Sequence, residues 1–111
     1  MEEVSFNCQT SELLHKIEHL RSLVKPRSAK ARRETILEIR VQPNFVSFRI
    51  PGMEVKQFCS TKGWASYTFS LEYFYMILTD YTGSIFAPKF IDGEMQVGGL
   101  FTKGLGYSME T

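Results

Sequence analysis

Cysteine is scarce in this sequence, and the scarcity argues against a cysteine metal site. Cys8 and Cys59 are the only cysteines among 111 residues. Their separation is not a metal-ligand spacing. Free cysteine is among the most buried residue types, so we expect two buried thiols in a reducing compartment. A disulfide between the two stays open, because pairing depends on geometry.

The chain also lacks long hydrophobic runs and a strong net charge. No run approaches the roughly 18 apolar residues that a membrane span needs. The acidic start, residues 1–4, is unlike a signal peptide. The net charge is +1, so the protein as a whole is not a polycation, and electrostatic arguments must be local. We expect a cytoplasmic protein with no membrane partner.

Aromatic residues are plentiful, with nine Phe and five Tyr, and they favour pleated sheets. The length fits one domain, which we place at residues 1–103, with a flexible tail at 104–111. The Asp92-Gly93 pair predicts a hairpin turn, and Gly98-Gly99 predicts a bulge or a close backbone approach. Alternating or β-rich runs predict strands at residues 4–8, 35–41, 45–50, 55–59, 64–69, 84–91 and 94–101.

Two segments have apolar residues at helical spacing. In residues 11–24 the apolar stripe is formed by Leu13, Ile17, Leu20 and neighbours. In residues 70–81 Ser70 is placed to cap the helix. This second segment is apolar on nearly every side, so a second layer of the fold or a partner should cover its outer face. We find no internal repeat at a fixed period.

The segment between the first helix and the next strand, residues 25–33, is strongly basic. It contains five cations, no acid and no apolar residue larger than Ala. This composition predicts an exposed, mobile loop.

The order of elements, together with several short stretches, resembles the repeating unit of the DNA sliding clamps, the bacterial β clamp and the ring clamps. The resemblance covers nearly the whole chain, from about Val4 to Phe101. It rests on Val4-Ser-Phe with the first apolar helix, the strand pair 36–41 and 45–49, the run 67–78 that leads a strand into a helix, and the hairpin around 91–98.

The resemblance implies an α+β fold with one curved antiparallel sheet of about six strands and two helices side by side on one face. Clamp rings are closed by edge strands that pair between neighbouring units, and their helices line the hole for DNA. Known clamp chains contain two or three such units, whereas this chain contains one. The second helix here has no Lys or Arg, so phosphate contacts would have to come from elsewhere.

The function that we predict is a non-catalytic interaction module that self-associates or binds a protein partner and has a role near DNA. We assign no catalytic residue, metal or cofactor. Partner contacts are predicted at Tyr73, Met76 and Ile77, where an exposed apolar cluster would mark an interface; cover by strands or the tail is the alternative. Cations near or in the basic segment are predicted to contact nucleic-acid phosphates: Lys16, Arg21, Lys25, Arg27, Lys30, Arg32 and Arg33.

Two alternatives remain open at this point. His15, Glu18 and His19 match the H-x-x-E-H pattern of inverted zinc hydrolases, in which two His bind zinc and Glu is the general base. A third ligand would have to come from another part of the chain, so a solvated helix face is the simpler interpretation. The other alternative is a structural subunit of a larger complex.

Overall fold

The computed structural model describes residues 3–25, 28–98, 100–103 and 106–109. No helix in these ranges is long and apolar enough to cross a membrane. The elements, in chain order, are β1 (Val4–Gln9), α1 (Thr10–Ser22), α2 (Ala29–Glu34), β2 (Ile36–Gln42), β3 (Phe45–Ile50), β4 (Met53–Phe58), β5 (Ser60–Lys62), β6 (Ala65–Ser70), α3 (Leu71–Asp80), β7 (Ile85–Phe86), β8 (Lys89–Ile91), β9 (Glu94–Val97), β10 (Leu100–Lys103) and β11 (Gly106–Met109).

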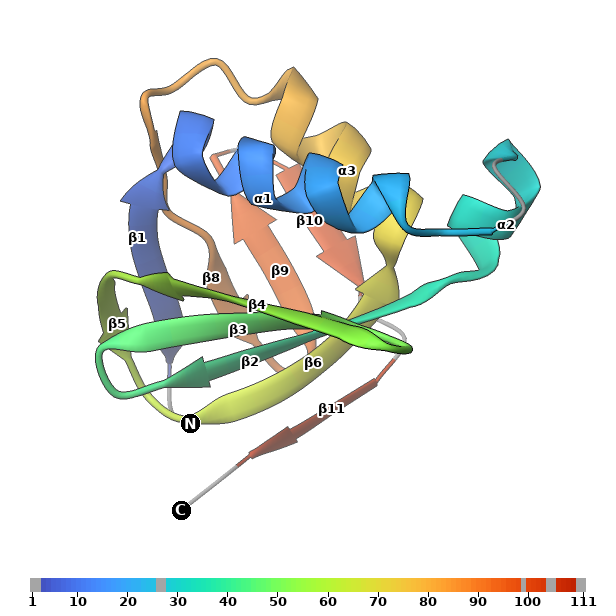
Figure 1. Cartoon of the computed structure of the whole chain (residues 1–111). Helices are drawn as coiled ribbons and strands as arrows, with labels where there is room; N and C mark the ends of the chain where they lie inside the picture. Colours follow the sequence, from blue (N-terminus) through green and yellow to red (C-terminus); the bar gives the residue numbers. More distant parts are fainter. Residues whose placement is uncertain (1–2, 26–27, 99, 104–105, 110–111) are drawn as a thin grey trace.

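The strands form two antiparallel sheets, where the sequence predicted one. The first sheet has the order β10-β9-β8-β1-β5, with β7 also paired to β1, and the second has the order β11-β6-β2-β3-β4. The chain passes from the second sheet to the first at Cys59, between β4 and β5. Helices α1 and α3 lie side by side across the strands (Figure 1). The predicted α+β class and the neighbouring helices are confirmed, and the number of sheets is corrected to two.

The two halves of the chain follow the same path and exchange strands. The series β1-α1-β2-β3-β4-β5 is repeated as β6-α3-β8-β9-β10-β11. Strand β1 pairs with β8 and β5, and its counterpart β6 pairs with β2 and β11. Each half therefore gives its first and last strands to the sheet that contains the middle three strands of the other half, and neither sheet is complete without both halves. The repeat has no fixed period in the sequence because α2 lengthens the first half.

The turns between strands occur where the sequence permits positive φ. The β8–β9 turn is Asp92-Gly93, with φ of 52° and 78°, as the sequence predicted. Asn44 takes the corresponding place between β2 and β3, with φ of 73°. Gly98, with φ of 59°, follows β9 directly, so it ends that strand and does not form a bulge within it. Gly99 lies outside the described residues.

The core is built from aromatic rings contributed by both sheets and by α3. Phe90 stacks on Tyr67 with ring centroids 4.3 Å apart. Phe6 packs within about 6 Å of Phe90, Phe48 and Phe86. Helix α1 adds three fully buried aliphatic residues, Leu13, Ile17 and Leu20, as its periodicity predicted.

Two segments differ from the expectations. The basic segment, predicted to be a mobile loop, contains the short helix α2, which begins after a capping bond in which Ala31 N donates to Ser28 Oγ over 3.1 Å. The predicted loose tail contains β11, which pairs with β6 from Gly106↔Thr68 to Met109↔Ala65. The domain boundary at residue 103 itself remains a prediction.

Candidate interaction surfaces

The basic helix α2 is attached to the start of α3. Thr35 Oγ1 donates to Ala31 O over 2.7 Å and closes the last turn of α2. Ser70 Oγ donates to Arg33 O over 2.8 Å, and Leu71 N donates to Thr35 O over 2.9 Å. These bonds fix the basic residues at one end of the helical layer.

Three of the predicted phosphate-binding cations lie on α2. Lys30 and Arg33 are exposed, and Arg32 is half-buried with an Nε that has no hydrogen-bond partner in the described part of the chain. Lys25, before the helix, is also exposed. Arg27 lies outside the described residues. The exposed cations here have the freedom that a phosphate contact needs.

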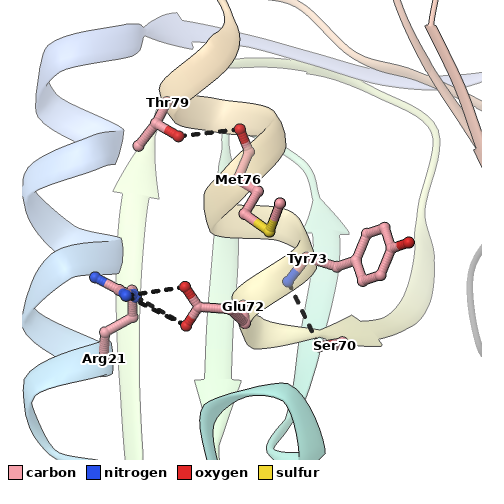
Figure 2. Close-up of polar contacts among 6 residues, drawn as sticks. All are labelled: Arg21, Ser70, Glu72, Tyr73, Met76 and Thr79. Carbon is pink, nitrogen blue, oxygen red and sulfur yellow. Dashed lines mark hydrogen bonds and ion pairs between the residues drawn. The ribbon is translucent and has the colours of Figure 1, made fainter. Parts of the chain in front are cut away.

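Lys16 and Arg21, on α1, are engaged within the protein. Lys16 Nζ donates to Lys56 O, on β4, over 2.7 Å. Arg21 Nη2 lies 2.9 Å from Glu72 Oε1 on α3, and Arg21 Nε donates to Glu72 Oε2 over 3.3 Å (Figure 2). The guanidinium also lies 3.6 Å from the centre of the Tyr75 ring. Their predicted role in nucleic-acid binding remains untested, but both side chains already stabilise the fold.

The outer face of α3 presents fewer apolar side chains than predicted. Tyr73 and Met76 are 61% and 53% exposed, whereas Ile77 is only 8% exposed. Placing Ile77 on the outer face was therefore wrong, because it packs into the core with Phe74 and Leu78. In Figure 2 Glu72 points toward α1, and Tyr73 points to the opposite side of α3. The exposed apolar pair, Tyr73 and Met76, forms what we call the α3 patch.

The H-x-x-E-H residues lie on the exposed side of α1. His15, Glu18 and His19 line a surface recess of about 510 Å³ with Lys16 and Val55. Among the described residues no group of three or more His, Cys, Asp or Glu side chains is arranged to hold a metal ion. The pattern thus has no third ligand in that part of the chain.

The clamp resemblance implied that sheet edges could pair between copies, but the sequence did not show which strands these edges are. The topology of the two sheets identifies them. In the part of the chain that the structure describes, the second sheet ends in β4, opposite β11, and the first sheet ends in β10, opposite β5, so that each of these strands has a free edge. Cys59 N donates to Asn44 O over 3.2 Å, which sets the alternation of the β3–β4 ladder. The alternation directs the backbone N–H and C=O groups of Glu54, Lys56 and Phe58 away from β3. Two of these groups have partners within the chain: the Lys56 carbonyl accepts from Lys16 Nζ, and the Phe58 carbonyl accepts from Gln57 Nε2 over 3.3 Å. The Phe58 side chain is 74% exposed.

These features define a class of protein: an α+β domain of two antiparallel sheets with a helical layer. The architecture matches that of the C. crescentus beta sliding clamp, with a TM-score of 0.69 and 15% sequence identity. The match covers 96% of this chain and 30% of the clamp chain, so the chain spans less than a third of that protein's length. No family model and no curated protein sequence matches the chain. The predicted resemblance to one unit of a sliding clamp is confirmed as a likeness of fold.

Proposed function

We propose that the protein is a non-catalytic interaction module whose copies associate head to tail through the free edges of their two sheets. The observation that carries this proposal is that β4 and β10 end different sheets and occupy equivalent places in the two halves of the chain. An edge strand with unpaired backbone groups is a template for pairing with another chain.

Strand β4 is the best-defined of these edges. It has six residues, and among the described residues the outward N–H and C=O of Glu54 and the N–H of Phe58 make no recorded hydrogen bond, while the Phe58 carbonyl accepts from Gln57 Nε2 over 3.3 Å. In the first sheet, the edge strand at the other end from β10 is β5, which has three residues and lies against the β2–β3 turn. There Thr61 Oγ1 donates to Gln42 O and accepts from Asn44 N. Because β5 is short and its central residue is bonded to this turn, it is a poor site for strand addition.

Pairing of β4 of one copy with β10 of the next is heterologous, because different surfaces meet. Such contacts form a ring if the rotation closes and a filament if it does not. The clamp likeness supports the ring, since the clamp chain is about three times as long as this one. Several copies of this single unit would replace the units that a clamp chain contains in sequence.

A proline on the outward-facing side of β4 tests this contact. In Glu54→Pro the lost N–H is one that β3 does not use, so the fold should survive while pairing between copies is blocked. The matched control, Glu54→Ala, removes the carboxylate and keeps the N–H. In sedimentation velocity we expect oligomers for the wild type and for Glu54→Ala, and monomer for folded Glu54→Pro. Equal association by all three proteins would refute β4 as the contact.

We further propose that the α2 cations bind nucleic-acid phosphates. The exposed Lys30 and Arg33 support this proposal, and Arg32 adds a third charge on the same helix. The Arg32 Nε is buried, so a phosphate contact would have to use the rest of its guanidinium. Three phosphate contacts would give a slope of log affinity against log salt of about −2.7 on duplex DNA.

The salt dependence separates a phosphate contact from other binding. Lys30→Glu with Arg33→Glu should reduce the slope by about 2. Lys62→Glu with Lys89→Glu is a control with the same change in charge away from α2. Binding that is unaffected by salt, or lost equally in both variants, would contradict this role.

We propose a protein contact at the α3 patch. Large exposed Met and aromatic side chains on one helix face are typical of interfaces. Tyr73→Ser with Met76→Ser should leave the midpoint of unfolding within about 2 °C, because both side chains are already solvated, and should weaken partner capture. A partner that binds the variant as tightly as the wild type would exclude the patch.

A further inference from the structure

We propose that Cys8 and Cys59 are a redox pair that forms a reversible disulfide across neighbouring strands. Both are free thiols in the reduced protein. Cys8 is buried near the C-terminal end of β1, and Cys59 is the residue that connects β4 to β5.

The strand register places the two cysteines opposite each other. Strand β1 pairs with β5 as Ser5↔Lys62, Phe6↔Thr61 and Asn7↔Ser60. One further step of the same register sets Cys8 opposite Cys59. The two strands lie side by side in Figure 1.

The backbone at this step has the geometry that favours a cross-strand disulfide. Cys59 N donates to Asn44 O, so the N–H points away from β1 and the Cys8–Cys59 step is not a hydrogen-bonded pair. At such pairs the Cα atoms approach to about 4.5 Å, within the range of about 4.4–6.8 Å for disulfides. Opposite residues in an antiparallel pair point to the same face, and both thiols contact the core cluster.

The surroundings assign the two thiols different roles. Cys8 is buried, and burial followed by the nearby Cys59 raises the pKa of its thiol to about 12. Cys59 is half-exposed; burial also raises its pKa, but the Lys16 ammonium and the Asn7 backbone N–H act in the opposite direction. Cys59 is therefore the thiol that reacts first with an oxidant, and Cys8 is the thiol that then attacks the oxidised Cys59.

The oxidant is a hydroperoxide, and the steps balance with hydrogen peroxide. The Cys59 thiolate attacks one peroxide oxygen, which gives Cys59 sulfenic acid and releases hydroxide. The Cys8 thiol sulfur then attacks the Cys59 sulfur, the S–O bond breaks, and water leaves with the Cys8 proton. The product is one disulfide, formed by two-electron oxidation of two thiols. It joins β1 in the first sheet to the end of β4 in the second.

The experiment exposes the reduced, folded full-length protein to hydrogen peroxide and measures intact mass without reductant. We expect a loss of about 2 Da, a linked Cys8–Cys59 peptide, a monomeric denatured chain and complete reversal by dithiothreitol. The closed loop is long, so the midpoint of thermal unfolding should rise by roughly 10 °C on oxidation.

Two single variants test the order of the steps. Cys8→Ser should leave Cys59 as a sulfenic acid that dimedone traps, and Cys59→Ser should leave Cys8 unmodified. Disulfides between chains, sulfinic acid at Cys59 beside a free Cys8, or two unreacted thiols would overturn the proposal. A lower midpoint of unfolding after oxidation would also overturn it, because the disulfide would then not fit the native strands.

Discussion

Neutralising Glu72 should destabilise the contact between the two long helices. Glu72 on α3 and Arg21 on α1 approach to 2.9 Å, with side chains 15% and 19% exposed. At an effective dielectric constant of about 20, charges roughly 4 Å apart attract by about 4 kcal/mol, and desolvation offsets much of this. Removing one partner costs about 0–1 kcal/mol at the surface and about 3–5 kcal/mol when the pair is buried. For this mostly buried pair we expect about 2 kcal/mol for Glu72→Gln.

The measurement is the free energy of unfolding by denaturant, checked by the thermal midpoint, which should fall by about 10 °C. Asp80→Asn is the matched control on the same helix: its side chain is exposed, and its change should stay within about 0.5 kcal/mol. In a double-mutant cycle with Arg21→Met, the two losses should add to more than the loss in the double variant. Equal stability of Glu72→Gln and Asp80→Asn would refute the inference that this ion pair holds the helices together.

Three further predictions concern other parts of the chain. Burial raises the pKa of the Cys8 thiol from 9.0 to about 12 on folding. The contribution of this thiol to the free energy of unfolding is therefore complete below pH 9 and is lost as pH rises from 9 toward 12. In reductant at pH 10 the wild type should therefore lose about 1 kcal/mol more stability, relative to pH 8, than Cys8→Ala does; equal losses would contradict the burial of this thiol. Gly63→Ala should destabilise by about 1–3 kcal/mol in urea, because φ is +82° and a Cβ would lie 2.8 Å from Val4 Cγ2; a neutral result would contradict the close approach of the β5–β6 turn to β1. His15→Ala should leave the zinc content of the purified protein unchanged, and stoichiometric zinc lost in that variant would instead support the hydrolase alternative.

Local signals were sufficient to predict most elements and the pair of helices. Ser70 as a cap followed by an apolar run placed α3 correctly, and the structure shows the capping bond from Tyr73 N to Ser70 Oγ at 3.5 Å. The Asp92-Gly93 turn followed directly from its two residues. These features depend on short-range chemistry that a single sequence contains.

The errors have different physical causes. Helix α2 was missed because charge composition was given more weight than helix propensity, although Ala-Lys-Ala-Arg-Arg-Glu after Ser28 has both good helix formers and a cap. Ile77 was assigned to the outer face, whereas the structure buries it with Phe74 and Leu78. On the same helix Tyr75 is half-exposed beneath the Arg21 guanidinium. The surroundings of Ile77 and Tyr75 depend on how α1 packs against α3, which the sequence alone does not specify.

The pairing of strands between the two halves of the chain could not be predicted from the sequence. Strand β1 finds partners near residues 60 and 90, and nothing in Val4–Gln9 specifies either. The same long-range pairing places Asn7 opposite Ser60, one step before the proposed Cys8–Cys59 pair, and leaves β4 and β10 at the ends of their sheets among the described residues. The candidate contacts therefore depend on topology, whereas the candidate cations could be read from composition.

The molar mass of the wild-type protein in solution, measured by light scattering over a concentration series, tests the proposed self-association most directly. One chain has a mass of 12.8 kDa. Head-to-tail pairing of sheet edges predicts a mass that reaches a fixed multiple of this value for a ring, or grows steadily with concentration for a filament. A constant 12.8 kDa at every concentration, up to the millimolar range, would contradict it.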